Sequence, residues 1–356
     1  MKQTTKYVGL DVHQATTVAT VRTDTGRVLV RSVLPTEEGA LLGWFGGMRG
    51  AVHVALEEGT QAQWLHDLLT PVVDRVLVCD RRGEPHRGNK GDAHDADALS
   101  ELLRCQRLRA VYHGSPDRAT LRELARAYQN LVEDATRVML RLKALYRARG
   151  IRTPGHAVYQ AAQRAEWLGK LPAGARFCAR TLYAELEVLL TLRPQAKRAL
   201  LAEAKRDPAW TVLRTIPFLG PVRVAMLLAT MQTPWRFRTK RNLWAYAGLA
   251  VVTRTSAEYD DVNGRPVRRA RAPLTRGLNR NHNPVLKEVF KSAATAAATR
   301  RGALQELYHG MLARGMRAEL ARVTLSRKLA AITLHLWKTG ERYEPTRRTM
   351  STQATR

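Results

Sequence analysis

The sequence predicts an α/β domain at the N-terminus followed by a mainly α-helical region. Residues 6–34 contain three short runs in which apolar and polar side chains alternate, which is the pattern of β-strands. Residues 51–103 then alternate short apolar runs with helical patterns. From residue 118 to about 149, apolar side chains recur every three or four positions, which is typical of one long amphipathic helix.

The predicted elements of the N-terminal part follow one another in the order βββ-α-β-α-β-α. We expect strands at 7–12, 16–22, 28–34, 51–56 and 75–79, and helices from Thr36 through Trp44, at 61–69 and at about 92–103. A turn at Asp24-Thr25-Gly26 joins the second and third strands, and Thr36 is expected to cap the first helix. A meander of three strands followed by βα units is the order of an RNase H-like fold.

The rest of the chain is expected to be helical. Helices predicted over 118–149, 176–192 and 194–205 would form a long coiled-coil-like connector, and helices over 222–231, 283–299 and 303–338 would form a compact domain with a polar, basic loop up to about residue 273. The predicted domains are therefore an α/β domain over 1–112, a helical connector over 113–208, a mainly α-helical C-terminal domain over 209–340 and a disordered tail over 341–356.

The charge of the chain favours a polyanionic partner. Lys and Arg number 59 against 31 Asp and Glu, which gives a net charge of +28. Neutralising phosphates releases condensed counterions, so nucleic acid is the expected partner. No apolar run is long enough to cross a bilayer and no signal peptide is expected, so we expect no membrane partner. The cysteines Cys79, Cys105 and Cys178 have no CxxC spacing and fit a reducing cytoplasm.

Four carboxylates form the candidate catalytic set. Asp11 ends the first strand, Glu57 ends the fourth, and Asp92 and Asp95 lie three residues apart at the start of a helix. Oxygen ligands suit Mg²⁺, and two ions roughly 4 Å apart stabilise the attacking and leaving oxygens of phosphodiester chemistry. We therefore expect two Mg²⁺ ions, for which Mn²⁺ could substitute.

Each of these acids also has an ordinary structural interpretation. An Asp after a strand is commonly a turn former, Asp92 could cap its helix, and Asp95 could be a favourable first-turn charge. The sequence does not decide whether Glu57 or Glu58 is the ligand. His13 and His94 are interpreted as bystanders, because Mg²⁺ prefers oxygen.

A second set of residues is expected to contact nucleic acid. Six arginines and an asparagine crowd a short segment that also holds glycines: Arg265, Arg268, Arg269, Arg271, Arg276, Arg280 and Asn279. Residues 216–221 resemble a helix-hairpin-helix turn, whose backbone N–H groups can hold a phosphate, or are a simple tight turn. The aromatic side chains at 235, 237, 244 and 246 could stack on bases or belong to the core.

Short motifs in matching order resemble the IS110-type transposases. In the N-terminal half they are residues 6–13 (KYVGLDVH), 56–57 (LE) and 90–99 (KGDAHDADAL), which resemble the DEDD, RuvC-like nuclease domain of that family. In the C-terminal half they are residues 216–221 (IPFLGP), 236–238 (RFR), 246–249 (YAGL) and 255–256 (TS). The resemblance covers most of residues 6–300. The chain has Ala250 where the family usually has Pro after Gly-Leu, and Ala257 where it usually has Gly.

The resemblance implies a function and a set of site residues. Asp11, Glu57, Asp92 and Asp95 match the acidic tetrad, and Ser256 matches the serine nucleophile of the C-terminal transposase domain. The implied activity is recombination of donor and target double-stranded DNA through a serine–phosphate intermediate, guided by a structured noncoding (bridge) RNA. The family is also implied to act as a homo-oligomer, a dimer or a tetramer, in the bacterial cytoplasm in association with the nucleoid.

Two other functions remain open on the sequence alone. One is a metal-dependent, RuvC-like junction endonuclease with the same tetrad and no covalent step. The other is a nucleic-acid-binding protein with a decayed, non-catalytic nuclease fold. The sequence does not settle whether the serine and the carboxylates act in one chain or in different chains.

Overall fold

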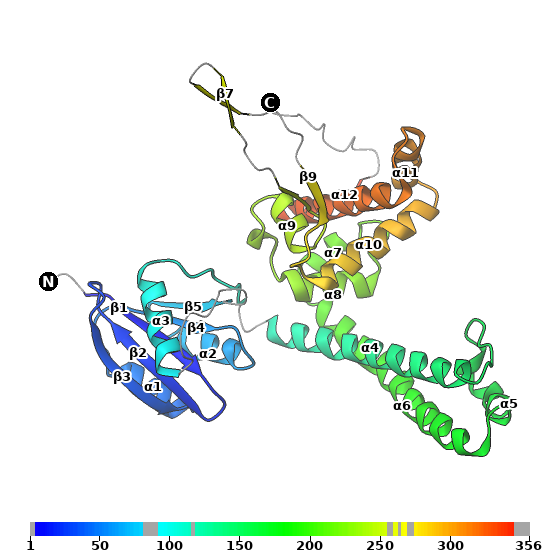
Figure 1. The fold of residues 1–356 in the computed structure, drawn as a ribbon, viewed down its shortest axis with the longest axis horizontal. Coiled ribbons are helices and arrows are strands. Elements are labelled where there is room, and N and C mark those ends of the chain that lie inside the picture. Colours follow the sequence, from blue (N-terminus) through cyan, green and yellow to red (C-terminus); the bar gives the residue numbers. More distant parts are fainter. Residues whose placement is uncertain are drawn as a thin grey trace. The chain divides into compact units, whose positions relative to one another are not determined.

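The computed structural model describes residues 4–80, 92–114, 118–254, 259–262, 265–268 and 274–344. The chain divides into two compact units, residues 1–117 and residues 118–356. The first unit contains a mixed sheet and three helices, and the second unit is mainly helical (Figure 1).

The first unit is built around one five-stranded sheet with the order β3-β2-β1-β4-β5. Its elements are β1 (Lys6–Val12), β2 (Thr16–Arg22), β3 (Val28–Pro35), α1 (Glu38–Gly46), β4 (Val52–Glu57), α2 (Ala62–Leu69), β5 (Arg75–Cys79) and α3 (Asp92–Arg104). Strands β1, β2 and β3 pair antiparallel, whereas β4 pairs parallel to both β1 and β5. The predicted order of the elements is confirmed, with each predicted strand within one or two residues of its observed bounds.

Alternation along the central strands divides the side chains between two cores. Val8 and Leu10 of β1 and Val54 and Leu56 of β4 are fully buried in one core, together with apolar side chains of α1 and α2. The opposite face contributes Ala55, Leu77 and Cys79 to a second core with Leu99 and Leu103 of α3. Helices α1 and α2 therefore cover one face of the sheet and α3 covers the other, because successive side chains of a strand point to opposite faces.

Helix α3 lies directly on the backbone of β1 at Gly9. A Cβ atom at Gly9 would lie 2.1 Å from the carbonyl oxygen of Ala96 and 2.5 Å from the backbone nitrogen of Ser100. Only a residue without a side chain permits this approach. Gly9 therefore fixes how closely α3 packs on the centre of the sheet.

One predicted detail of the first unit is wrong. Thr36 does not cap α1, whose N-cap is Glu37 and has no side-chain capping bond. The hydroxyl of Thr36 instead donates to the carbonyl oxygen of His13 at 3.0 Å and lies 2.9 Å from the hydroxyl of Thr17. These contacts tie the start of α1 to the β1–β2 turn, so tertiary contacts outweigh the local capping preference.

Two long helices form an antiparallel hairpin at the start of the second unit (Figure 1). They are α4 (Ala119–Arg147) and α6 (Ala173–Ala204), joined through two short 3₁₀ turns and α5 (Arg164–Gly169). Three cores lie along this hairpin, and the one at its far end packs Tyr146 against Trp167 and Tyr183. Helix α6 continues through Pro194, whereas the sequence predicted separate helices on either side of Arg193.

The remaining helices form the largest core of the molecule. They are α7 (Ala209–Leu213), α8 (Pro221–Met231), α9 (Lys240–Tyr246), α10 (Pro284–Thr299), α11 (Ala303–Ala313) and α12 (Ala318–Thr339). Leu121 and Ala125 of α4 and Leu200 and Ala204 of α6 belong to the same core. The base of the hairpin is thus built into the C-terminal helices.

Two features of the C-terminal region differ from the sequence predictions. The predicted basic loop contains the strands β6 (Val251–Arg254), β7 (Tyr259–Val262), β8 (Arg265–Arg268) and β9 (Leu274–Leu278). Strands β6 and β9 pair antiparallel, as do β7 and β8. The helix predicted over 303–338 is two helices, α11 and α12, separated by a turn in which Gly315 has a φ of +83°. The expected tail over 341–356 lies outside the described residues from residue 345 onward.

Across the described ranges, no helix combines the length and the apolar composition needed to cross a membrane.

The contact at Gly9 predicts a large effect of a very small substitution. Gly9→Ala would force a methyl group against backbone atoms of α3, so we expect a loss of at least about 2 kcal/mol in the free energy of unfolding of the first unit. Gly39→Ala in α1 is the control, because a Cβ there meets no atom within 4 Å. Thermal unfolding measures both variants, and equal melting temperatures would contradict the packing argument.

Candidate active site

Asp11 and Glu57 lie side by side at the ends of neighbouring parallel strands. The register of β1 and β4 pairs Leu10 with Leu56, and the two acids are the next residues of the two strands. Adjacent strands are about 4.8 Å apart. The sheet therefore brings two of the four predicted carboxylates to one edge.

Both acids lie on the face of the sheet that α3 covers. Residues two positions apart in a strand point to the same face of the sheet. Asp11 is two positions after Gly9, which contacts α3, and Glu57 is two positions after Ala55, which belongs to the core formed with α3. The Asp11 side chain is 20% exposed, and one of its oxygens lies 3.2 Å from Nε2 of His13. Glu57 is exposed.

The direction of α3 brings its first turn toward the same edge. Near the C-terminal end of α3, Arg104 donates to the carbonyl oxygen of Asp24 in the β2–β3 turn, and Ser100 accepts from Arg22 at 2.9 Å. Arg22 pairs with Tyr7, near the start of β1. The N-terminal end of α3 therefore lies toward the end of β1, where Asp11 is.

Asp95 of α3 lies on the side of the helix that faces the sheet. Ala96 and Leu99 are fully buried, and positions 92 and 95 lie one turn before them. Asp95 is half-buried, whereas Asp92 begins the helix and its side chain lies outside the described residues. The fold thus directs the described members of the predicted tetrad, Asp11, Glu57 and Asp95, toward one end of the β1–α3 contact, and the position of the Asp92 side chain stays a prediction.

The candidate residues suit a divalent metal ion because their side chains offer oxygen ligands, although the described side chains do not form a cluster around one point. Among the described side chains, no three His, Cys, Asp or Glu groups converge closely enough to hold a metal ion. The neighbouring oxygen donors Asp11 and Glu57, with Asp95 on the helix facing them, are the ligand type that Mg²⁺ prefers. The donor set therefore fits the expected ion, with Asp92 as the remaining predicted member.

The contacts of Glu58 favour Glu57 as the candidate ligand. One carboxylate oxygen of Glu58 lies 2.7 Å from Nε2 of His113, and the other ring nitrogen of His113 lies 2.9 Å from Oε1 of Gln63. His113 also stacks on His66 of α2. Glu58 is thereby tied to groups around α2, on the other face of the sheet from α3.

Asp97, a third acid of the same helix, has a different role. It accepts two hydrogen bonds from the guanidinium group of Arg31 in β3, at 2.6 and 3.1 Å. The hydrogen bond from Arg31 holds the pKa of Asp97 below its ordinary value. This ion pair attaches α3 to strand β3, so Asp97 positions the helix that carries Asp92 and Asp95.

The predicted nucleophile lies outside the described residues. Ser256 falls in residues 255–258, directly after β6. The predicted phosphate contacts Arg269 and Arg271 are likewise outside, as are the side chains of Arg268 in β8 and Arg276 in β9. Their placement as a single site with the carboxylates stays a prediction.

The described members of the basic segment have different surroundings. Arg265 and Arg280 are exposed. Asn279 uses its side-chain N–H groups within the chain, donating to the carbonyl oxygens of Ala245 and Asn281 at 3.1 and 2.7 Å. Contact of Asn279 with nucleic acid therefore stays a prediction, while its observed bonds join the end of α9 to the segment before α10.

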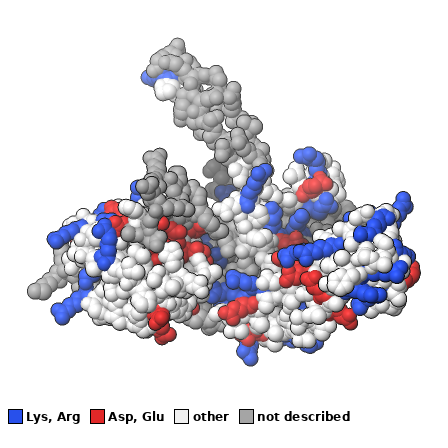
Figure 2. Space-filling view, turned by 60° about the horizontal axis from the view of Figure 1, so that its bottom comes forward, with Lys and Arg blue, Asp and Glu red and all other residues white. Residues whose placement is uncertain are grey.

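Positive charge also gathers on the helical hairpin. Residues 137–180 contain ten Lys or Arg and a single acidic residue, Glu166. Lys and Arg side chains are prominent toward the right of Figure 2, over this part of the chain. The sequence prediction placed the basic surface near residues 265–280 and missed this second one, although a count of charges along the chain would have found it.

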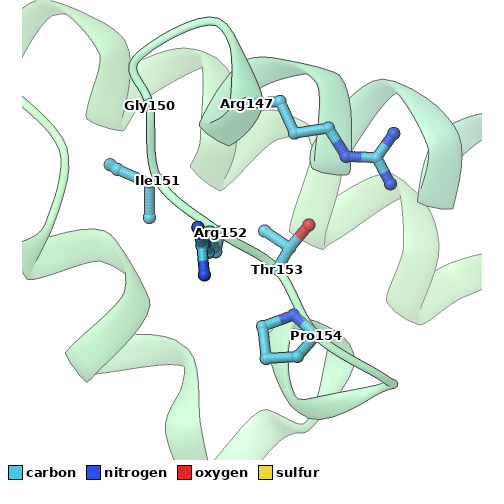
Figure 3. A pocket seen from close by; sticks show the side chains of 6 residues that line it. All are labelled: Arg147, Gly150, Ile151, Arg152, Thr153 and Pro154. Carbon is cyan, nitrogen blue, oxygen red and sulfur yellow. The ribbon is translucent and has the colours of Figure 1, made fainter.

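A hollow at the far end of the hairpin does not belong to the carboxylate site. It has a volume of about 460 Å³ and is lined by Arg147, Gly150, Ile151, Arg152, Thr153 and Pro154. Figure 3 shows the loop 150–154 crossing beside the end of α4. The lining contains no carboxylate and lies in the second unit, so it cannot supply the predicted metal ligands.

Asp95 and Asp97 of α3 are expected to respond differently to substitution. Asp97→Asn removes the pairing with Arg31 and should lower the free energy of unfolding by about 1 kcal/mol, while stabilisation by added Mg²⁺ is retained. Asp95→Asn should change stability little in the absence of metal but should reduce the stabilisation by Mg²⁺, because a bound ion stabilises only the folded state. Thermal unfolding with and without MgCl₂ measures both effects, and full Mg²⁺ stabilisation of Asp95→Asn would exclude Asp95 as a ligand.

Comparisons with known proteins match two parts of the chain to transposase families. Residues 8–148 match the family model of the IS110-type DEDD transposases, described as a transposase, and residues 211–279 match the model of the transposase IS116/IS110/IS902 family. The chain is also 25% identical over 204 residues to a Pseudomonas aeruginosa protein named probable family 20 transposase. That match covers 55% of this chain and 60% of the relative, which is less than two thirds of the relative's length. The two family models match in chain order and include the strand of Asp11 and the helix of Asp95, and the chain belongs to the IS110 family of transposases.

Proposed function

We propose that this protein is a DNA transposase that cuts and rejoins strands with a DEDD metal site and a serine nucleophile. The observation that carries the proposal is the neighbouring position of Asp11 and Glu57 on the sheet face that α3 covers. The family membership and the net charge of +28 support a DNA substrate. Donor and target duplexes are the proposed substrates, and the cytoplasm with its nucleoid is the proposed location.

The N-terminal unit is proposed to have an RNase H-like, RuvC-like fold. The strand order β3-β2-β1-β4-β5, with an antiparallel meander followed by parallel strands, supports this assignment. In such a sheet the central strand and its parallel neighbour end at the same edge. Asp11, Glu57, Asp92 and Asp95 would hold divalent ions there, most simply Mg²⁺, with Mn²⁺ as a substitute. When bound, the ions supply positive charge that stabilises the attacking and leaving oxygens of the phosphodiester.

The proposed role of Ser256 is nucleophilic. Its hydroxyl oxygen attacks the phosphorus and loses its proton, an ester bond forms between serine and phosphate, and the 3′-oxygen leaves as a 3′-hydroxyl. A 3′-hydroxyl of another strand then displaces the serine, so the phosphodiester bond is restored without an external source of energy. A structured noncoding RNA as guide and a homo-oligomeric assembly, dimer or tetramer, are proposed on the family membership.

The covalent step predicts a protein–DNA adduct that depends on one hydroxyl group. In cells carrying the gene with its natural flanking DNA, the wild-type protein should form an adduct that survives denaturation, and Ser256→Ala should abolish it. Asp11→Asn should also abolish strand cleavage while leaving DNA binding intact, because it removes a candidate metal ligand and not a surface cation. Denaturing gels for the adduct and amplification of new DNA junctions give the two readouts.

The neighbouring hydroxyls provide the matched control for this experiment. Thr253→Ala and Thr255→Ala should retain the adduct, since neither is the proposed nucleophile. Metal-dependent cleavage by the wild type with no adduct would instead support a junction endonuclease. If Asp11→Asn still recombined DNA, the proposed catalytic role of the four carboxylates would be wrong.

The basic segment predicts a salt-dependent contribution to binding. Replacing Arg265, Arg268 and Arg280 by Gln should weaken duplex DNA binding at all sequences and lower the slope of log affinity against log salt by up to about 3, because each lost phosphate contact removes about 0.9. Replacing Arg300, Arg301 and Arg314 by Gln removes the same charge near α11 and should change the slope less. If both triple variants showed the same slope of log affinity against log salt, the basic segment 265–280 would not be a specific phosphate-binding site.

A further inference from the structure

One exposed tryptophan stands apart from the aromatic side chains around it. Trp235 lies in a short 3₁₀ turn, Pro234–Arg236, and is 70% exposed, more than any other of the seven tryptophans in the chain. Nearby, Phe237 is 3% exposed and belongs to the main core. The indole N–H of Trp244 donates to the carbonyl oxygen of Arg327. Of these candidates for base stacking, the structure leaves Trp235 at the surface.

The backbone that presents Trp235 is held firmly. Pro234 and Phe237 are buried on either side of the turn, and the backbone N–H of Phe237 donates to the carbonyl oxygen of Pro234. Arg236 donates to the carbonyl oxygen of Thr230 at 3.2 Å and to the hydroxyl of Tyr246 at 2.9 Å. A large apolar ring is therefore exposed at a fixed position. This favours a binding function, because a side chain that is already held in place loses little conformational freedom when a ligand binds.

One cation lies beside the exposed ring, and further cations follow it in the sequence. The ammonium group of Lys338 lies 5.3 Å from the centre of the Trp235 ring and donates to the carbonyl oxygen of Phe237 at 2.7 Å. Arg238, Lys240 and Arg241 are exposed directly after the turn. The stretch 208–257 contains seven Lys or Arg and no acidic residue. A flat exposed ring, a hydrogen-bonded ammonium group beside it and further exposed cations after it in the sequence match the two parts of a nucleotide, the base and the phosphate.

We propose that Trp235 stacks on an unpaired base of a nucleic acid strand, with the adjoining phosphates against Lys338, Arg238 and Lys240. A base inside a duplex has both faces covered by its neighbours, so a single ring presented at the surface favours a base that is unstacked. The inference rests on the proposed function and adds the chemistry of one contact, a single-stranded segment of DNA or RNA. The residues lie in the second unit, outside the carboxylate site.

The experiment compares single strands with a duplex on the full-length protein. Labelled oligothymidylate, oligouridylate and a blunt DNA duplex serve as probes, and fluorescence anisotropy measures their affinities. Trp235→Ala should weaken binding of at least one single strand by about five- to a hundredfold, which is the usual range for one stacked base. Its affinity for the duplex should change by less than about twofold, because the proposed contact needs an exposed base face. Trp235→Phe should restore most of the lost affinity.

A matched control and a second readout separate stacking from a structural effect. Trp64→Ala removes another tryptophan, which is 36% exposed on α2 in a segment, 57–74, without Lys or Arg, and should leave all affinities unchanged. Single strands should also quench the tryptophan fluorescence of the wild type, and Trp235→Phe should remove that component. Thermal unfolding verifies that each variant is folded.

The outcomes distinguish this inference from the proposed function. Wild-type protein that binds no probe would contradict both. Wild-type binding with unchanged single-strand affinity in Trp235→Ala, or an equal loss for single strand and duplex, would overturn the stacking contact alone. A change only in the sedimentation of Trp235→Ala would also overturn it, since the ring would then serve an interface between copies of the chain.

Discussion

The close contact between the backbone of β1 and helix α3 is the constraint on which the candidate site depends. Because Gly9 has no side chain, Ala96 and Ser100 of the helix approach the centre of the sheet. The bond from Arg22 to Ser100 and the pairing of Asp97 with Arg31 then fix the rotation and direction of the helix. The position of Asp95 relative to Asp11 and Glu57 is thus a result of packing several residues away.

The proposed metal site would bring negative charges together at one edge of the sheet. Carboxylates directed to one sheet edge repel one another when no cation is present. The first turn of α3 partly offsets this repulsion, since the positive end of the helix dipole favours acidic groups there. Asp97 lies on the same helix and accepts hydrogen bonds from the guanidinium group of Arg31, so its role is to position the helix that carries Asp95.

The sequence pattern predicted most of the first unit, because its central strands are short apolar runs between turn residues and its helices α2 and α3 are amphipathic. The same rules failed where tertiary contacts dominate. Strands β6 to β9 are short, contain several arginine and polar residues and show no regular alternation of apolar and polar residues, so their sequence predicted a loop. Helix α6 continues through Pro194 because both of its ends are fixed in packed cores, and these contacts outweigh the hydrogen bond that proline removes.

The candidate site was predictable in part for the same reasons. Strand ends and a helix start could be located for Asp11, Glu57 and Asp95. The choice between Glu57 and Glu58 needed the contact of Glu58 with His113, a residue 55 positions away in the sequence. The exposure of Trp235 also could not be predicted from the sequence, because Phe237 and Trp244 lie in the same basic stretch of the chain. Phe237 is nevertheless buried, and the indole N–H of Trp244 donates a hydrogen bond within the chain.

The separate cores along the α4–α6 hairpin have a consequence for how the molecule opens. The base of the hairpin shares its core with α8 and α10, whereas the far end is held by its own small cluster around Tyr146 and Tyr183, whose hydroxyls lie 3.2 Å apart. Local opening of a protein follows such cooperative units rather than whole helices. The two ends of α6, although one continuous helix, therefore belong to different units of local unfolding, and backbone amides at its start can exchange with solvent while those at its end remain protected.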